Sequence, residues 1–428
     1  MRKFINIFQA DRDRFRERLL AEVMRHTRAM VLESLPAEVK GSVWACVASF
    51  GELNHVTGSL REVRQLWHQS NDWLTGYIAY DYKNRLELLK SEGYDGVGLD
   101  DLCWVRPRYL LLNDGLGWQL GYATECDSEA TALAWLEGMM DATPVASKVR
   151  ESVELKARVN RDAYIATVND IKRHIARGDV YEMNYCTEFY SDEARLDAVD
   201  VYVRLTELSP MPFSALMKRG DRLLMCASPE RYLMKRGREL VSEPIKGTCG
   251  RGATVEEDAA LAHGLANNEK ERAENIMIAD LVRNDLSRVA QRGSVHVKEL
   301  CGVKSFRQVH QMVSTIGATL REGLDWVDAI EATFPMGSMT GAPKVSAMQL
   351  IEQCEVTRRG LYSGTVGYVT PEGDFDLNVV IRSILYNRAS GYVSYITGSA
   401  ITHLCDAEQE YEECLLKGKV MREVLEGR

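Results

Sequence analysis

The spacing of apolar residues divides the first third of the chain into short extended segments. Between Trp44 and Tyr122, runs of a few apolar residues are interrupted by Gly and Asp, as in WACVASFG, GYIAYDY and RYLLLNDGLGWQLGY. Short apolar runs bounded by turn residues are typical of antiparallel strands. The pattern therefore predicts strands and turns over this segment, followed by a helix from Thr124 to Met140.

The rest of the chain combines helical and extended patterns. Apolar residues recur at helical spacing from Ile165 to Ile175, and Gly178 is placed to end that helix. Further helices are expected over Glu269–Arg283, over Lys344–Glu352 and from Ala407 onwards. Strands are expected in VYEMNYCTEFY, RLLMCASPERYLM, ELVSEPIKGT, YSGTVGYVT, FDLNVVIRSILYN and GYVSYITGSAIT. Because the two kinds of element are mixed rather than strictly alternating, the predicted class is α+β.

One segment has neither pattern. From Asp141 to Glu154 the chain mixes Asp, Thr, Pro, Ser and Lys without periodicity. Such composition is typical of a boundary between structural units. We therefore expect an N-terminal part over residues 1–145 and a second part over residues 155–428.

Composition and charge narrow the classes of function. The 428 residues carry 53 basic and 62 acidic side chains, a net charge of -9, which argues against broad nucleic-acid binding. No apolar run approaches the roughly 20 residues that span a bilayer. Near the N-terminus, charge returns at Asp11 before a signal-peptide core is reached. These observations predict a globular cytoplasmic protein that binds neither nucleic acid nor membrane.

The ten cysteines stand singly, without a CxxC pair and without a His at zinc-finger spacing. We expect reduced and mostly buried thiols.

Lys246 is the first candidate for chemistry. In Ser242–Thr248, SEPIKGT, Pro244 and Gly247 bracket a short extended pair, which predicts a lysine at a strand end. A lysine is usually a solvated surface charge. In a dry pocket, however, its pKa is expected to fall and its amine to become a nucleophile. The order Lys-Gly-Thr without an upstream glycine excludes a phosphate-binding P-loop.

The second candidate is an acidic helix face. Glu410 and Glu413 are three residues apart and project from one side of the C-terminal helix, with Lys417 one turn beyond. Such charges often form only a salt-bridged surface. Together with Glu274, these carboxylates would suit a hard cation such as Mg²⁺.

Two further motifs place charges within apolar strands. Glu230 interrupts SPERYL and Arg382 interrupts NVVIRSILY. Exposure at a sheet edge is the simpler interpretation, since unpaired charges are seldom buried. FPMGSMTGAPK, which contains Ser338, is predicted to be a loop that opens a helix at about Pro343, where backbone N–H groups could face an anion.

In this order and spacing, the motifs from about Asp162 to Met421 resemble the chorismate-binding enzyme family. This family includes anthranilate synthase component I, aminodeoxychorismate synthase component I, and the isochorismate and salicylate synthases. The resemblance rests on GDVYEMNY, ASPERYL, EPIKGT, AENIMIADLVRNDLSRV, FPMGSMTGAPKVSAMQLIE, SGTVGY, NVVIRSI and EYEECLLKGK. It implies an α+β fold of large antiparallel sheets with surrounding helices, in which residues 155–428 form the chorismate-binding catalytic domain.

The residue at position 246 distinguishes branches of this family. PIKGT is similar to the aminodeoxychorismate synthases, whereas anthranilate synthases carry alanine in place of the lysine. The resemblance implies that Lys246 attacks C2 of chorismate while the C4 hydroxyl leaves, and that ammonia then adds at C4 and expels the lysine. Glu230 matches the position of the acid that assists the leaving hydroxyl.

The resemblance also implies ligands for a cofactor and for the substrate. Glu274 and Glu413 look like Mg²⁺ ligands, with Glu410 nearby. Arg382 looks like the clamp for a substrate carboxylate, a task that suits its bidentate fork. Further substrate contacts are expected from Ser338, Gly398, Ser399, Ala400 and Lys417.

Three positions depart from the family pattern. Glu182 stands where this branch often has Gln and the water-using isochorismate enzymes have Lys, which weakens the isochorismate interpretation. Gln311 replaces a His common in the family, and we assign no catalytic role to the neighbouring His310. Ala400 lies in a turn that is usually rich in glycine.

The implied reaction needs an ammonia source. The chain shows no glutaminase-like region, so we expect a separate glutamine amidotransferase subunit or free ammonium. No aminodeoxychorismate lyase region is evident either, so the product is expected to leave intact towards 4-aminobenzoate and folate. Anthranilate synthase component I and a non-catalytic chorismate-binding subunit remain the alternatives.

The N-terminal part matches the family only loosely, through GYIAYDYKN and through VLES at Val31–Ser34. VLES is similar to the effector segment of anthranilate synthases and makes this part a candidate tryptophan site. Short motifs of this kind also recur by chance.

Overall fold

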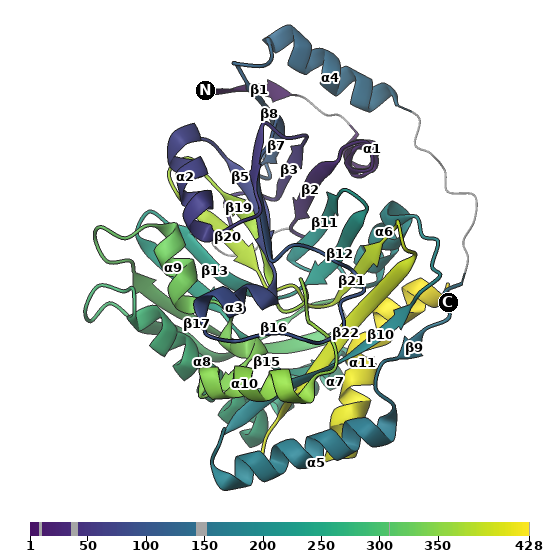
Figure 1. Ribbon diagram of the computed structural model, residues 1–428, viewed down its shortest axis with the longest axis vertical. Coiled ribbons are helices and arrows are strands. Elements are labelled where there is room, and N and C mark those ends of the chain that lie inside the picture. The colour runs from purple at the N-terminus through teal and green to yellow at the C-terminus, as the bar shows by residue number, and fades with distance from the viewer. Residues whose placement is uncertain (8–10, 36–41, 143–151, 308, 428) are drawn as a thin grey trace.

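The computed structural model describes residues 1–7, 11–35, 42–142, 152–307 and 309–427 (Figure 1). All of the strands in these ranges belong to two antiparallel sheets. The 12-stranded sheet consists, in spatial order, of β1 (Arg2–Ile7), β8 (Trp118–Ala123), β7 (Tyr109–Asn113), β3 (Cys46–Phe50), β2 (Arg28–Glu33), β11 (Phe213–Arg219), β12 (Arg222–Ser228), β21 (Ser383–Asn387), β22 (Tyr392–Ile401), β10 (Glu182–Ser191) and β18 (Gly341–Ala342), with β9 (Lys156–Ala157) also paired to β10. The 10-stranded sheet consists of β15 (Ile245–Gly250), β17 (Val309–Thr319), β14 (Glu239–Glu243), β13 (Arg231–Arg236), β20 (Phe375–Asn378), β19 (Thr365–Val369), β5 (Leu74–Ile78), β6 (Leu102–Arg106) and β4 (Asn54–Val56), with β16 (His296–Ser305) paired to β17.

Helices surround the sheets, as the predicted fold class requires. They are α1 (Arg12–Val23), α2 (Leu60–Ser70), α3 (Lys83–Leu86), α4 (Glu129–Asp141), α5 (Arg161–Arg177), α6 (Ala198–Leu208), α7 (Val255–Asn267), α8 (Glu269–Ser287), α9 (Trp326–Thr333), α10 (Lys344–Cys354) and α11 (Ala407–Glu426), with short 3₁₀ turns η1 (Tyr80–Tyr82) and η2 (Gly337–Met339). No helix in the described ranges is long and apolar enough to cross a membrane.

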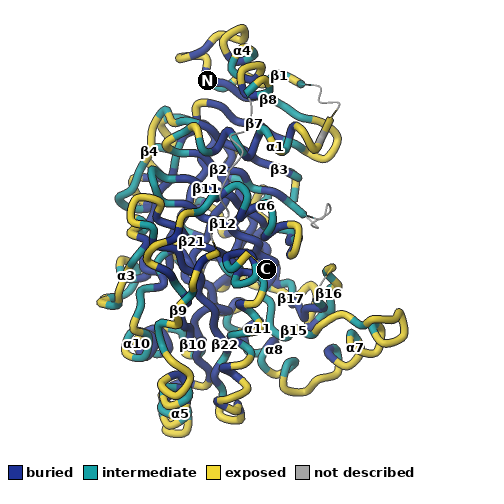
Figure 2. The backbone as a smooth tube through the Cα atoms, turned by 90° about the vertical axis from the view of Figure 1, so that its right-hand side faces the viewer, coloured by how far each residue is buried: buried dark blue, intermediate teal, exposed yellow. Residues whose placement is uncertain are grey.

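Apolar side chains on the two faces of the larger sheet belong to different cores. In β11, Ala215 and Met217 pack in a cluster that also contains residues of the smaller sheet. Leu216, between them, packs with residues of α1, α6 and α11 on the opposite face. This division follows from the two-residue period of a strand, which directs successive side chains to opposite faces. The smaller sheet therefore covers one face of the larger sheet, and helices cover the other. Most of the strands are buried, although β16 is largely exposed, and α5 and α7 carry long exposed stretches (Figure 2).

The helices that carry candidate site residues begin where the sequence predicts. α8 begins at Glu269 and α11 at Ala407, and Gly178 ends α5 in the left-handed conformation with φ +86°. Each N-terminus is capped by the residue before it, since the side chains of Asn268 and Asp406 accept hydrogen bonds from backbone N–H groups of the first turn. α8 then packs on β15 and β17, and α11 packs on β22.

Two predictions in the N-terminal part were wrong. The helix expected over Thr124–Met140 is present as α4, but its predicted start is wrong, because Ser128 caps it and it begins at Glu129. The segment expected to hold only strands and turns contains α2, which starts with a capping box between Ser59 and Glu62. This capping box could have predicted α2 from the sequence, since Ser-x-x-Glu before a run of apolar residues at helical spacing marks a helix start.

The predicted boundary from Asp141 to Glu154 lies mostly on residues 143–151, outside the described residues. Strands from both sides of this segment share each sheet: β2 pairs with β11 in the larger one, and β5 pairs with β19 in the smaller one.

Candidate active site

Lys246 lies at the start of β15, where the pairing with β17 is irregular between Ile245 and Thr248. Gly247 allows this bend, because its φ of +92° is a backbone conformation that residues with a side chain rarely adopt. The amide of Asn275 donates a hydrogen bond to the Lys246 carbonyl oxygen at 3.2 Å and holds the backbone to α8. The lysine side chain is 12% exposed.

The Lys246 amine contacts a carboxylate from the other sheet. Its Nζ donates a hydrogen bond to Glu182 Oε1 at 2.8 Å. Burial disfavours the charged amine, but Glu182, Glu274 and Glu413 outweigh that effect and raise the pKa of Lys246. The lower pKa expected of a lysine in a dry pocket was therefore wrong, because the pocket is dry but strongly acidic.

The carboxylates predicted to bind Mg²⁺ gather at α8 and α11. Burial raises the pKa of Glu274 to about 7, and the nearby Glu182 carboxylate adds to this effect. Burial and the neighbouring Glu413 also raise the pKa of Glu410. Lys417 lies 2.6 Å from Glu413 and, against the effect of burial, keeps the pKa of that carboxyl below its usual value. Lys270 Nζ approaches Glu274 at 3.9 Å and Glu410 at 3.6 Å.

The oxygen donors of this group are of the chemical kind that a hard cation prefers. Glu274 Oε1 and Glu410 Oε2 are buried oxygens that accept no hydrogen bond in the described structure. Unsatisfied carboxylate oxygens are the ligands that Mg²⁺ prefers. Within the described ranges, however, no three His, Cys, Asp or Glu side chains stand close enough together to hold a metal ion as they are. Lysine ammonium groups pair with these carboxylates instead.

Glu230 and Ser338 come together from distant motifs. Glu230 lies between β12 and β13, is 3% exposed, and accepts a hydrogen bond from Ser338 Oγ at 2.6 Å. Burial raises the pKa of Glu230 to about 7, although Ser338 and Lys246 oppose the shift. A carboxyl with this pKa can donate a proton near neutral pH. Exposure at a sheet edge, the simpler interpretation of this glutamate, was wrong.

Arg382 also lies between strands rather than within one. It joins β20 to β21 with φ +52° and donates a hydrogen bond from Nη1 to the Lys417 carbonyl oxygen at 2.8 Å. Burial lowers the pKa of its guanidinium. No ion pair involves Arg382 in the described part of the chain. Its positive charge is therefore not neutralised by a carboxylate and could bind an anionic ligand.

The predicted substrate contacts on β22 lie beside β10. Gly398 pairs with Cys186, and a Cβ atom at Gly398 would meet the Cys186 sulfur at 2.5 Å, which explains glycine there. Lys417 Nζ donates a hydrogen bond to the Gly398 carbonyl oxygen at 2.9 Å. The Ser399 hydroxyl lies 3.2 Å from Tyr164 Oη. Ala400 pairs with Asn184 and is partly exposed.

Three residues near Lys246 show what sequence reasoning missed. Glu182 was noted only as a departure from pattern, yet it contacts the Lys246 amine directly. Lys270 and Glu271 were not singled out, although the spacing of Lys270 and Glu274 is the i, i+4 signal for an ion pair on α8.

The departures at positions 310 and 311 differ from each other. His310 is buried, with Nε2 at 2.9 Å from Asp258 and Nδ1 at 2.8 Å from Ser305. These two contacts explain why a histidine is buried at this position, and no catalytic role is needed to explain it. Gln311 pairs with Thr248 of β15, and its Oε1 is buried without a hydrogen-bond partner.

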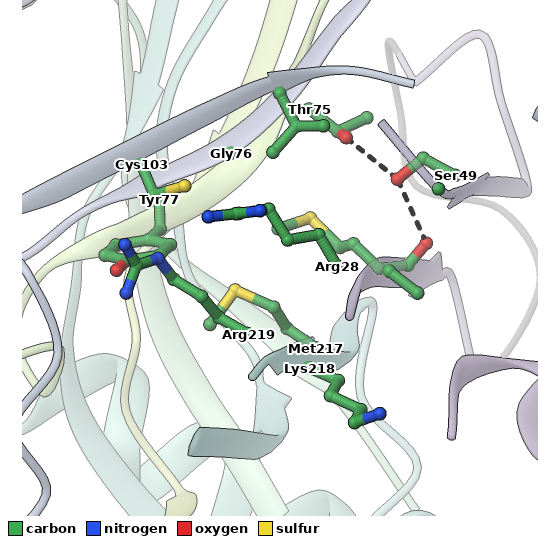
Figure 3. A pocket seen from close by; sticks show the side chains of 13 residues that line it. Arg28, Ser49, Thr75, Gly76, Tyr77, Cys103, Met217, Lys218 and Arg219 are labelled. Carbon is green, nitrogen blue, oxygen red and sulfur yellow. Dashed lines mark hydrogen bonds between the residues drawn. The ribbon is translucent and has the colours of Figure 1, made fainter. Parts of the chain in front are cut away.

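Two cavities lie away from Lys246. The pocket in Figure 3 is lined by residues of β2, β5 and β11 and includes none of the predicted site residues. Its arginines, Arg28 and Arg219, already pair with Glu52 and Asp100. The second cavity is lined by Glu33 and Ser34 of VLES together with residues of β19 and β20. The tryptophan site expected there stays a prediction.

Comparisons with known proteins define the class to which this site belongs. The chain matches the family described as chorismate binding enzyme over residues 6–423. It is 34% identical over 367 residues to aminodeoxychorismate synthase component 1 of Bacillus subtilis, covering 82% of this chain and 76% of that protein. It is 33% identical over 360 residues to anthranilate synthase component 1 of Thermus thermophilus, covering 82% and 77%.

The fold agrees with these matches. The solved structure of anthranilate synthase component I from Streptococcus pneumoniae TIGR4 covers 90% of this chain and 93% of its own, with a TM-score of 0.80 at 24% sequence identity. The chain therefore belongs to the family of chorismate-binding enzymes, and the α+β fold of large antiparallel sheets and surrounding helices is confirmed.

Proposed function

We propose that the chain is an aminodeoxychorismate synthase component I, which converts chorismate and ammonia to 4-amino-4-deoxychorismate through a covalent lysine intermediate. The observation that carries this proposal is the position of Lys246. Its amine is buried among acidic side chains. Glu230 is one of them, since the positive charge of Lys246 acts to lower the pKa of that carboxyl. A nucleophile beside an acid that is half protonated near neutral pH is the arrangement that displacement of a hydroxyl requires.

The first step joins the substrate to the enzyme. The neutral amine of Lys246 forms a bond to C2 of chorismate, the two ring double bonds shift, and the C4–oxygen bond breaks. Glu230 gives its proton to the departing hydroxide, which leaves as water. Ser338 donates to the same carboxyl and so stabilises the carboxylate that remains.

The second step releases the product. Ammonia forms a bond to C4, the double bonds shift back, and the C2–nitrogen bond to Lys246 breaks. The Glu230 carboxylate can take a proton from the new C4 ammonium group, which restores the acid. Arg382, which has no carboxylate partner in the described structure, would bind a substrate carboxylate throughout.

Magnesium is part of the proposal. Glu274 and Glu413 would hold the ion, with Glu410 beside them, and a bound Mg²⁺ would neutralise a substrate carboxylate next to the reacting ring. In its absence, Lys270 and Lys417 offset the charge of these glutamates.

The ammonia source is proposed to be a separate glutamine amidotransferase subunit. The relative from Bacillus subtilis is named as component 1, and such a name implies at least one further component. The intact product would then be processed elsewhere towards 4-aminobenzoate and folate.

Anthranilate synthase component I is the second candidate, because the Thermus thermophilus protein is nearly as similar as the Bacillus one. Lys246 argues against it, since direct attack of ammonia at C2 needs no lysine there. The test is to incubate the purified chain with chorismate, Mg²⁺ and ammonium and to identify the product by mass spectrometry. We expect 4-amino-4-deoxychorismate. Anthranilate with pyruvate would favour the second candidate, and an absence of turnover would favour a non-catalytic subunit.

A further inference from the structure

The proposed reaction requires a proton acceptor for Lys246. The Lys246 amine donates a hydrogen bond to the Glu182 carboxylate at 2.8 Å, and this ion pair keeps the lysine as an ammonium ion. An ammonium nitrogen has no lone pair and cannot attack carbon. A proton must therefore leave Nζ before the bond to C2 forms.

We propose that Glu182 is the base that takes this proton, an assignment that rests on the proposed function. Among the described residues, Glu182 Oε1 is the acceptor of the Lys246 side-chain hydrogen bond, at 2.8 Å. The carboxylate is 1% exposed, so bulk water does not compete for the same proton. A base within hydrogen-bond distance of the proton it removes satisfies the geometric condition for general base catalysis.

The backbone holds this base in place. Glu182 begins β10, which is paired to β22 on one side and to β18 on the other. Its own partner across the sheet is Ala342. Its second oxygen, Oε2, is buried and accepts no hydrogen bond.

The neighbouring carboxylates are less suited to the task. Glu413 is paired at 2.6 Å with Lys417, and Glu274 faces Lys270. Neither forms a hydrogen bond with the Lys246 amine in the described structure. Glu230 must already carry a proton to assist the leaving hydroxyl, so it cannot accept another.

The proton balance closes over one cycle. Glu182 takes a proton from the Lys246 ammonium, and the neutral amine attacks C2 while Glu230 protonates the leaving hydroxide. When ammonia attacks C4, the C2–nitrogen bond breaks and the electron pair returns to the lysine nitrogen. Glu182 then returns its proton to that amine, and Glu230 is reprotonated by the C4 ammonium group. One chorismate and one ammonia give one 4-amino-4-deoxychorismate and one water.

The test measures how fast chorismate binds covalently to the enzyme. Chorismate and Mg²⁺ are added without ammonia, and the covalent adduct is followed by intact-protein mass spectrometry of quenched samples. Glu182→Gln keeps the size of the side chain and removes the base. Without a base beside it, the ammonium form of Lys246 loses its proton more slowly, so adduct formation should slow on the order of 100-fold. Glu182→Asp, which keeps a carboxylate, should lie between the two.

The matched control is Glu271→Gln. Glu271 belongs to the same acidic group, and the charge of Lys246 affects its pKa, but it makes no hydrogen bond to the amine in the described structure. Because Glu271 also acts on the proposed Mg²⁺ ligands Glu274 and Glu413, the comparison is made at saturating Mg²⁺, where this variant should form the adduct at nearly the wild-type rate. An equally slow rate in Glu271→Gln would show that removing any negative charge near Lys246 slows adduct formation. That result would overturn the assignment of Glu182 as the base.

Chemical rescue provides a positive readout. Glu182→Ala leaves room for a small carboxylate, so added formate should restore adduct formation in Glu182→Ala and not in Glu182→Gln. A Glu182→Gln enzyme that forms the adduct at the wild-type rate would refute the role of Glu182 while leaving the covalent mechanism standing. If the wild-type enzyme formed neither adduct nor product, the proposed function itself would fail.

Discussion

Ser338 donates a hydrogen bond to Glu230 at 2.6 Å and thereby joins two motifs that lie 108 residues apart in the sequence. The contact is buried, and it connects the residue proposed as the acid to the loop that leads into α10. Glu230 still has a pKa near 7, because burial outweighs the effect of this hydrogen bond.

Replacing Glu230 with Gln should increase stability while reducing activity. The carboxyl pKa is about 7 in the folded protein, against a reference value of 4.5. Between these values the folded state binds more protons than the unfolded state, so stability falls as the pH rises and the loss is complete above pH 7. Glu230→Gln removes this loss, worth up to about 3 kcal/mol at roughly 1.4 kcal/mol for each pKa unit.

Urea unfolding at about pH 5 and about pH 8 checks this prediction. The free energy of unfolding of Glu230→Gln should be close to wild type at the lower pH and higher than wild type at the upper pH. Its turnover should fall by about 100-fold or more, because the acid is missing. Equal stability of the two proteins at both pH values would argue against a raised pKa for Glu230.

Activity should depend on Mg²⁺ through Glu413. Glu413→Gln should raise the Mg²⁺ concentration needed for half-maximal turnover at least about tenfold, in line with the effect of losing a group that supports a metal. Glu423→Gln, further along α11 and paired with Lys419, is the control and should behave like wild type. Turnover that persists in excess chelator would exclude the magnesium assignment.

Thiol-blocking reagents should leave the chemistry intact. All ten cysteines are free, and seven of them are buried. Cys249 is partly exposed and stands three residues after Lys246, so a bulky adduct there could obstruct the site. Cys249→Ser should turn over at the wild-type rate and resist the reagent. Loss of turnover in a Cys249→Ser protein that still folds and binds chorismate would contradict the lysine-centred mechanism.

Gly398 should not tolerate a side chain. In Gly398→Ala the new methyl group would lie 2.5 Å from the Cys186 sulfur and 2.8 Å from Asn184 Oδ1. Such overpacking costs about 1–3 kcal/mol, and we also expect a higher KM for chorismate. Gly264→Ala, in open space on α7, is the control and should stabilise the helix by up to about 1 kcal/mol. Thermal unfolding and steady-state kinetics compare the two variants.

Local sequence signals predicted the elements that carry the site, because caps and hydrophobic periods are properties of short segments. α8 and α11 begin at the predicted residues for this reason. The same rules missed α2, whose capping box lies within a segment dominated by turn residues. Motif resemblance singled out Lys246 and Glu230 without indicating what surrounds them.

The contacts between elements could not be predicted in this way. Glu182 and Lys246 are 64 residues apart and lie on different sheets, so no local pattern relates them. The sign of the Lys246 pKa shift depends on this contact, because burial and neighbouring carboxylates act in opposite directions. A sequence can indicate that a lysine is buried, but the balance of charges around it is a property of the folded chain.

Intact-protein mass spectrometry of Lys246 variants tests the central claim most directly. With chorismate and Mg²⁺ but no ammonia, the wild-type protein should gain the mass of chorismate less one water, located on Lys246, and should release 4-amino-4-deoxychorismate when ammonium is added. Lys246→Ala and Lys246→Arg should gain no mass, since neither side chain offers a neutral amine. A Lys246→Ala enzyme that makes 4-amino-4-deoxychorismate at the wild-type rate would contradict the covalent role of the lysine.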